Sequence, residues 1–352
     1  MHLSAEEAAL VGTIYSPPLA RRPWMLADVL PSCPLRYYSL ARWALVDALR
    51  VCGVRAGDRV LVPGLICREV LASLCVVGAS ADFYSVSTTL EAAFVPGSLE
   101  PAKAILAVNY FGVPQDLEPF RDYCRRTGAA LIEDNAHGLF SRDRAGEWLG
   151  SRGDVGIYSF RKSIAVPSGA ALVVNGDRWQ PPAELPSVHG FDARYKVKQA
   201  FRRVAGALGP VRTFDAIGIV RRARRVSTGD ALPLAPPDAQ ERIPGAPNPD
   251  AMLSRSLSVA DPDFESRRRR GLYELVGPLV VAVGGIRALP ALSDNVVPYG
   301  FPFFAPPARM SVLAAALRRL GLPLAQWPEL PLAVAPVAPD HYRDLHVVPF
   351  LW

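Results

Sequence analysis

The chain has 352 residues and a mass of 38.1 kDa, so we expect two lobes, or one large domain with an appendage. Half of its residues are hydrophobic and a fifth are charged, which excludes wholesale disorder. The longest uncharged stretches fall well short of the ~20 residues of a membrane span. Glu6 and Glu7 stand where a secretory signal carries positive charge. Five cysteines without paired spacing favour a cytoplasmic location over a disulfide framework.

Positive charge is in modest excess, with 39 lysines and arginines against 33 acidic residues. Much of the excess lies in two arginine runs, at 221–225 and 267–270. Nucleic-acid-binding proteins usually interleave such runs with aromatic side chains or carry them on a reading helix. Here the first run precedes a proline-rich stretch and the second falls in an expected helix. We therefore expect solvated helix faces at both runs and no nucleic-acid partner.

Short apolar runs alternate with helical periodicity between residues 39 and 175. Helices are expected at 41–51, 68–77 and 117–126. Strands are expected at 59–62, 83–86, 104–108, 129–132 and 156–158. Because apolar strands alternating with helices are typical of βαβ units, the pattern predicts a mostly parallel sheet covered on both faces.

The alternation of strand and helix patterns is interrupted at residues 227–251. These residues are rich in Pro, Gly and Asp and predict a linker or long excursion between lobes. Beyond it, helices are expected at 264–276 and 310–320. The last residues, HVVPFLW, read as a strand, and a closing helix is expected to be missing. We place a large domain at residues 1–235 and a small C-terminal domain, shortened at its end, at residues 236–352.

Polar side chains follow two strands of the expected sheet. Asp134 and His137 come after the strand at 129–132, and Ser159 and Lys162 after the strand at 156–158. Ligands of an open parallel sheet bind beyond the carboxyl ends of its strands, and the helix starting near Ala41 could hold a phosphate on its first amides. Lys162 is one of only four lysines. This inventory fits a site for pyridoxal 5'-phosphate (PLP), which needs a lysine, an acid for its ring nitrogen and an anchored phosphate.

Segments in this order resemble the DegT/DnrJ/StrS group of sugar aminotransferases, which are fold-type I PLP enzymes. They are AGDRVLVPG (56–64), Gly78-Ala79, AILAVNYFGVPQDLEPF (104–120), ALIEDNAHG (130–138), GDVGIYSFRK (153–162) and SGAALVVN (168–175). Weaker similarity continues through YGFPFF (299–304), LRRLGLPLAQWP (317–328) and LHVVPF. The resemblance implies the fold-type I PLP-transferase fold, an α/β fold whose large domain has a mostly parallel sheet flanked by helices and whose smaller C-terminal domain is also α/β.

The resemblance also implies roles for the residues after the strands. Lys162 matches the lysine that forms the internal aldimine and moves protons during transamination. Asp134 matches the acid bonded to the pyridine nitrogen, His137 the residue at the ring's phenolic oxygen, and Ser159 a phosphate ligand. Each also has a structural reading, since a strand-end Asp often caps a helix, a lone His is often a satisfied structural residue, and a Ser can simply end a strand.

Further site residues are implied with less direct matches. Arg42 and Trp43 match the phosphate-binding turn, and Cys67 matches the aromatic that stacks on the ring. Asn109 lies in the loop at the mouth of the site, and Arg309 could bind a substrate carboxylate or lie on the surface.

Four departures from the family pattern bear on the ligand. The family usually has Ser or Thr at Arg42, so the phosphate is expected to be held partly by a guanidinium. Cys67 cannot stack comparably, so another side chain covers that ring face or the cofactor is held loosely. Lys162 follows the Ser-Phe pair after one residue, where a longer interval is common. The Gly-Tyr-Asn-Tyr-Arg-like segment is replaced by residues 189–198.

The chain is thus expected to be a PLP-dependent aminotransferase. It would move an amino group from glutamate or glutamine to a keto substrate, in this family usually a nucleotide-linked keto sugar, and Lys162 would be its catalytic residue. The resemblance implies a homodimer, because sites of this family form at a dimer interface. Two alternatives stay open: a PLP enzyme of other chemistry, such as dehydration or reaction on an amino-acid-like substrate, and a non-catalytic partner protein that keeps the fold.

Overall fold

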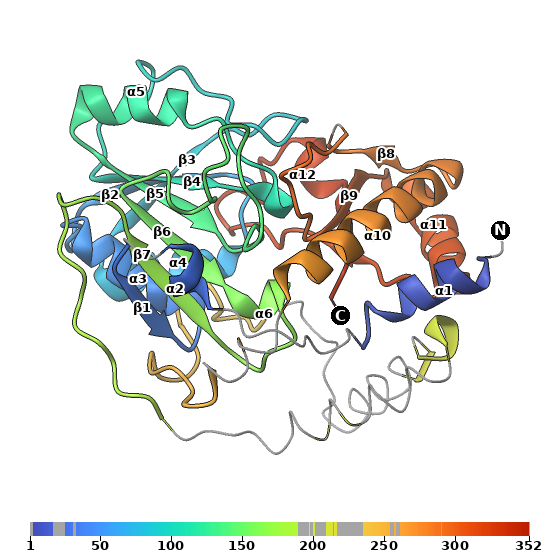
Figure 1. Cartoon of the computed structure of the whole chain (residues 1–352). Coiled ribbons are helices and arrows are strands. Elements are labelled where there is room, and N and C mark those ends of the chain that lie inside the picture. Colours follow the sequence, from blue (N-terminus) through green and yellow to red (C-terminus); the bar gives the residue numbers. More distant parts are fainter. Residues whose placement is uncertain are drawn as a thin grey trace.

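The computed structural model shows a large lobe and a small lobe (Figure 1). It describes residues 3–16, 25–30, 33–188, 197, 200, 209–213, 215–216, 235–253, 257, 261–289 and 291–351. The replaced segment at 189–198 and the arginine run at 221–225 therefore lie outside the described residues, except for position 197.

The large lobe is built on a seven-stranded sheet with the order β1-β7-β6-β5-β4-β2-β3. Its strands are β1 (Leu35–Tyr38), β2 (Arg59–Pro63), β3 (Ser80–Tyr84), β4 (Ala104–Val108), β5 (Ala130–Asn135), β6 (Val155–Ser159) and β7 (Ala170–Val174). Strands β2 to β6 pair in parallel, whereas β7 and β1 are antiparallel to their neighbours. This is the mostly parallel α/β architecture that the sequence predicts.

Helices cover both faces of this sheet, which explains why its central strands are apolar throughout. Helices α3 (Ala41–Val51) and α4 (Leu71–Val77) lie on one side and α5 (Glu118–Thr127) on the other (Figure 1). A 3-10 turn, η1 (Arg68–Val70), leads into α4, and the four-residue helix α6 (Phe160–Ser163) follows β6. Every residue of β4, β5, β6 and β7 is buried.

The small lobe holds a four-stranded antiparallel sheet with the order β10-β11-β9-β8. Its elements are α10 (Pro262–Ala282), β8 (Ile286–Arg287), β9 (Gly300–Phe304), α11 (Pro307–Arg319), β10 (Ala325–Gln326), α12 (Asp340–Arg343) and β11 (Leu345–Pro349). The expected helices at 264–276 and 310–320 and the terminal strand are thus confirmed, and the first of these helices is longer than its apolar pattern indicates.

The N-terminal helix α1 (Ala5–Gly12) packs on the small lobe and not on the sheet that follows it in the chain (Figure 1). Val11, Ile14 and Tyr15 are buried in one core with Leu272 of α10 and Phe301 of β9. The division of the chain at residue 235 stays a prediction, and this packing adds the first residues of the chain to the small lobe. A single sequence offers no signal for a contact across more than 250 positions.

The described part of the expected linker, residues 235–251, is packed against the large lobe. The Arg68 guanidinium donates to the carbonyls of Ala235 and Pro236, and the Ser39 hydroxyl donates to the carbonyl of Ala246. Ile243 joins a small cluster with two buried side chains of α3 and α4. A proline-rich segment has few amide donors, so its carbonyls are free to accept from side chains, and the expectation of a linker is corrected for these residues.

The docking of α1 can be tested at Ile14, which is fully buried in the core of the small lobe. We expect Ile14→Ala to lower the free energy of unfolding by about 2–5 kcal/mol, because it removes apolar contacts and leaves a cavity. Urea unfolding followed by circular dichroism measures this. The control is Val312→Ala on α11, where the valine is 66% exposed. An equally small effect for both variants would contradict the packing of α1 into this core.

Candidate active site

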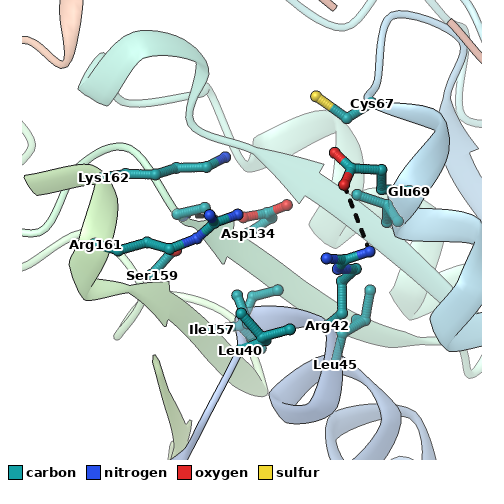
Figure 2. Close-up of a pocket in the computed structure, with 13 residues that line it drawn as sticks. Leu40, Arg42, Leu45, Cys67, Glu69, Asp134, Ile157, Ser159, Arg161 and Lys162 are labelled. Atoms are coloured by element: carbon teal, nitrogen blue, oxygen red, sulfur yellow. Dashed lines mark hydrogen bonds and ion pairs between the residues drawn. The ribbon is translucent and has the colours of Figure 1, made fainter. Parts of the chain in front are cut away.

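A pocket opens at the carboxyl ends of the parallel strands, where the sequence places the candidate residues. Asp134 comes from β5, Ser159 from β6, and Lys162 from α6, while the start of α3 and the turn η1 close the other side. Figure 2 shows Lys162 and Arg161 entering the pocket opposite Arg42, Glu69 and Cys67. Because β2, β5 and β6 run in parallel, their ends meet at one edge of the sheet.

Lys162 and His137 are brought together at the base of the pocket. Lys162 Nζ lies 3.1 Å from His137 Nε2. The backbone N–H of Phe111 donates to His137 Nδ1 at 3.2 Å. Because the Phe111 amide occupies Nδ1, Nε2 is the ring nitrogen that faces Lys162.

His137 is buried beside two aromatic rings. Tyr299 stacks on it at 4.4 Å between ring centroids, and Phe111 stacks at 5.6 Å. Burial lowers the pKa of His137 well below its ordinary value, and the positive charges of Lys162 and Arg269 lower it further. The histidine is therefore neutral at physiological pH.

Phe111 adopts a left-handed backbone conformation, with φ of 54° and ψ of 19°. This conformation is costly for a bulky residue, on the order of 1–2 kcal/mol. It turns the Phe111 amide toward His137, while the Phe111 carbonyl accepts from the Tyr299 amide at 2.8 Å. The strain is thus located where it fixes both the histidine and the ring stacked on it.

Two neighbouring carboxylates of β5 face opposite sides of the sheet, because side chains alternate along a strand. Asp134 faces the pocket and accepts from the Ala136 amide at 2.9 Å. Burial raises the pKa of the Asp134 carboxyl, whereas Lys162 and the Ala136 amide act in the opposite direction. A buried carboxylate beside a lysine is suited to hold a cationic ring nitrogen.

Glu133, on the other face, is fully buried in a network with Arg152 and Asn109. The Arg152 guanidinium donates twice to Glu133 and once to the Asn109 side-chain oxygen, and the Asn109 amide donates to Glu133 at 2.8 Å. Asn109 does border the pocket. Its two polar atoms are nevertheless engaged in bracing β5, and the substrate contact predicted for it gains no support from this arrangement.

Two arginines make the pocket positively charged. Arg161 of α6 enters it on the side of Lys162, with Ser159 nearby, and Arg42 of α3 enters it from the opposite side (Figure 2). Arg42 pairs with Glu69 at 3.5 Å, and no ion pair of Arg161 is present among the described side chains. The N-cap of α3, Leu40, has no side-chain acceptor, so the first amides of this helix are open to an anion. Burial lowers the pKa of Arg42, and the charge of Arg161 contributes to that shift.

Cys67 lies on the wall where a stacking aromatic was expected. Burial raises the pKa of its thiol to about 11, so it is uncharged. A second, smaller cavity shares Cys67, Asp134 and Lys162 with this pocket and is also lined by Trp327 of the small lobe. Trp327 packs edge-on against Phe111, with ring centroids 4.8 Å apart. An aromatic side chain therefore does border this region, but it comes from the other lobe.

Two predicted site residues do not reach the pocket. The Trp43 indole packs into the hydrophobic core beside Val46 and Ala72, and its amide bonds to the Leu40 carbonyl. Because residues one apart on a helix face different directions, Arg42 faces the pocket and Trp43 the core. Arg309 is exposed on α11, close to Gly284, and is absent from the pocket lining. The structure gives no support to a role of either side chain in this pocket, and both assignments stay predictions.

The arginine run at 267–270 is also not a solvated face. Arg268 and Arg269 are buried on α10 and both pair with Glu265. Together they lower the pKa of Glu265 despite its burial. Arg270 binds the carbonyls of Ser293 and Val296. The expectation of a solvated face is wrong for Arg268 and Arg269, whose guanidinium groups bind backbone carbonyls of other elements, whereas Arg267 is exposed.

Sequence reasoning missed Arg161, Glu69, Tyr299 and Trp327. Arg161 could have been found, since it directly precedes the candidate lysine at the same strand end. Tyr299 and Trp327 come from the other lobe; both fall in segments of weaker resemblance to the family, 299–304 and 317–328, which do not single them out as residues of this pocket. Among the residues that the structure describes, no helix is long and apolar enough to cross a membrane, and no cluster of acidic, His and Cys side chains could hold a metal ion.

The pH dependence of folding tests the environment of His137. Because its pKa is lowered in the folded state, the unfolded chain takes up the proton first as the pH falls below about 6.5. Stability is therefore lost from about pH 6.5 downward, by up to about 1.4 kcal/mol per pH unit. We expect His137→Gln to flatten this part of the profile, measured by urea unfolding of the ligand-free protein at pH 5–8. Burial also lowers the pKa of His346, but this histidine is present in both wild type and His137→Gln and affects them equally. If the free energy of unfolding fell with the same slope below pH 6.5 in both proteins, a neutral buried His137 would be contradicted.

A model of the DegT/DnrJ/EryC1/StrS aminotransferase family matches residues 41–220. A curated relative is L-glutamine:2-deoxy-scyllo-inosose aminotransferase of Streptoalloteichus tenebrarius, which is 37% identical over 134 residues, 36% of this chain and 30% of the relative. A second curated relative, from Streptomyces kanamyceticus, is 30% identical over 197 residues, 51% of this chain and 47% of the relative. The chain thus spans less than half the length of these relatives.

Solved structures share the fold over nearly the whole chain. A DegT DnrJ EryC1 StrS aminotransferase from Brucella abortus aligns with a TM-score of 0.62 at 17% identity, covering 97% of this chain and 89% of the other. The aminotransferase TlmJ from Streptoalloteichus hindustanus aligns with a TM-score of 0.60 at 19% identity, covering 99% of this chain and 91% of the other. At such identities the likeness establishes the fold.

Proposed function

This chain belongs to the DegT/DnrJ/EryC1/StrS aminotransferase family, and we propose on this basis that it is a PLP-dependent aminotransferase. The observation that carries the proposal is the single pocket that brings Lys162 and Asp134 together with the guanidinium groups of Arg42 and Arg161. An amine, a buried acid and an anion site are the three features that PLP requires of a protein.

The two arginines that line the pocket fit the phosphate of PLP. Arg42, Arg161 and Ser159 would hold it together with the first amides of α3. Guanidinium groups bind phosphate oxygens through charge-assisted hydrogen bonds, and the helix N-terminus adds to the attraction. Glu69, now paired with Arg42, would yield that guanidinium to the phosphate.

Three further side chains would contact the ring of PLP. Asp134 would bind the ring nitrogen and keep it protonated, Cys67 would line one face, and His137 would place its Nε2 near the phenolic oxygen. PLP supplies, when bound, a carbonyl that condenses with amines and a ring that accepts the electrons of a broken bond. Lys162 Nζ, which lies 3.1 Å from His137 Nε2 and close enough to Asp134 to lower the pKa of that carboxyl, would hold and move the proton at the reacting carbon.

We propose glutamate or glutamine as the amino donor and a keto sugar, linked to a nucleotide in the usual case of the family, as the acceptor. The Streptoalloteichus tenebrarius relative is by its name a glutamine-dependent aminotransferase of a cyclic ketone, which supports glutamine and a polyhydroxylated ketone. A homodimer and a cytoplasmic location stay predictions from the resemblance.

The absorption spectrum tests the cofactor and the lysine together. With added PLP we expect a visible band that borohydride fixes covalently on Lys162, and no such band for Lys162→Ala. The control is Lys103→Ala, since Lys103 lies outside this pocket. Bleaching of the band by glutamine or glutamate would identify the donor. A spectrum of free PLP in both wild type and Lys162→Ala would overturn the proposal and favour a non-catalytic partner protein.

The phosphate site can be tested separately by comparing PLP with pyridoxal, which lacks the phosphate. We expect Arg161→Ala to weaken PLP binding on the order of tenfold, because a charge-assisted hydrogen bond is lost, and to leave pyridoxal binding unchanged. Fluorescence titration measures both affinities, and Arg55→Ala is the control, since Arg55 is exposed away from the pocket. Equal losses for the two ligands would show that Arg161 does not bind the phosphate.

A further inference from the structure

Arg269 of α10 is the largest fully buried side chain among the described residues, with 1% of its surface exposed. All five of its N–H donors have acceptors, which is the full capacity of a guanidinium. Nε donates to Glu265 at 3.0 Å, Nη1 to the carbonyls of Pro298 and Tyr299 at 3.2 and 3.4 Å, and Nη2 to the carbonyls of Ser163 and Lys162 at 2.7 and 3.5 Å. One side chain of the small lobe thus binds the backbone of Lys162.

The turn that carries Lys162 has little support of its own. Helix α6 has only four residues, and its main internal bond runs from the Ile164 amide to the Phe160 carbonyl at 2.7 Å. A helix of this length is unstable by itself in water. The carbonyls at its end are orphan acceptors, and Arg269 satisfies two of them.

The other two carbonyls that Arg269 binds, those of Pro298 and Tyr299, connect it to Lys162 indirectly, through Tyr299 and His137. Arg269 holds the backbone at Pro298 and Tyr299, and the Tyr299 ring stacks on His137 with an angle of 11° between the planes. His137 in turn lies 3.1 Å from Lys162 Nζ. Arg269 therefore fixes Lys162 at its backbone and fixes the ring behind the histidine that faces its amine.

We propose that Arg269 is a positioning residue through which the small lobe sets the geometry of Lys162. The inference rests on the proposed function for its consequence in catalysis, and the contacts themselves stand without a cofactor. An ammonium cannot replace this guanidinium, since it has three donors on one atom and cannot span two pairs of carbonyls. The charge alone is therefore insufficient, and the fork of the guanidinium is what this position requires.

Arg268 provides a matched control one residue away. It is 3% exposed, pairs with the same Glu265, and donates to a backbone carbonyl, that of Phe350. Among the described residues its hydrogen bonds run to Glu265, Thr13 and Phe350, and none to the lysine turn. A loss of general stability would affect Arg268→Lys and Arg269→Lys alike, whereas a positioning effect would appear only in Arg269→Lys.

The first readout is hydrogen exchange of the PLP-free protein. We expect the Ile164 amide to lose about tenfold or more of its protection in Arg269→Lys, relative to Arg268→Lys at equal global stability. The second readout is the bound PLP: its visible band should shift and react faster with borohydride in Arg269→Lys only. Equal exchange at Ile164 and equal spectra in both variants would overturn the proposal.

Tyr299→Leu distinguishes the direct bonds of Arg269 to the lysine turn from the indirect contact through Tyr299 and His137. It is also the second variant to test if Arg269→Lys does not fold. It removes the stacked ring and leaves the carbonyl bonds to Arg269 in place. We expect normal exchange at Ile164 together with an altered spectrum of bound PLP. An unaltered spectrum would eliminate the route through His137. If wild type itself shows no PLP band, the proposed function fails, while the exchange experiment still decides whether Arg269 holds the lysine turn.

Discussion

A buried guanidinium needs acceptors for its charge and its donors, and this requirement shapes the molecule around its pocket. Arg152 is satisfied by Glu133 and Asn109 and braces β5 from behind. Arg68 binds three carbonyls of residues 235–237 and pairs with Glu329 at 2.9 Å. Arg269 binds the lysine turn. Since a buried charge without partners costs several kcal/mol, each arginine makes the position of one segment depend on another.

The strand ends and the lysine could be predicted from the sequence because their signals are local. Apolar runs separated by helical periodicity give the parallel sheet, and the polar residues directly after β5 and β6 must then share an edge. Asp134 and Lys162 therefore lie in one pocket as expected. Trp43 shows the limit of this reasoning, because a motif match to a helix start does not say which of two adjacent side chains faces the site.

Residues that act across the lobes carry no local signal. The run at 267–270 is read as a solvated face from charge alone, and its burial depends on carbonyls offered by the segments near residues 163, 298 and 350. Proline-rich residues 235–251 read as a linker for the same reason: the acceptors they offer are used by side chains far away in sequence. A single sequence does not show which polar groups far apart in the chain will form hydrogen bonds with each other.

The wall beside Cys67 shows how such coupling changes the site. A small thiol leaves space where the family pattern has an aromatic ring, and Trp327 of the small lobe borders the same cavity. The Arg68 amide donates to the Glu329 carbonyl at 2.8 Å, and its guanidinium pairs with the Glu329 side chain. The residue after Cys67 is thus tied to the segment that carries Trp327. Cys67 of one lobe and Trp327 of the other therefore line the same cavity, and this wall of the site is complete only when the two lobes are docked.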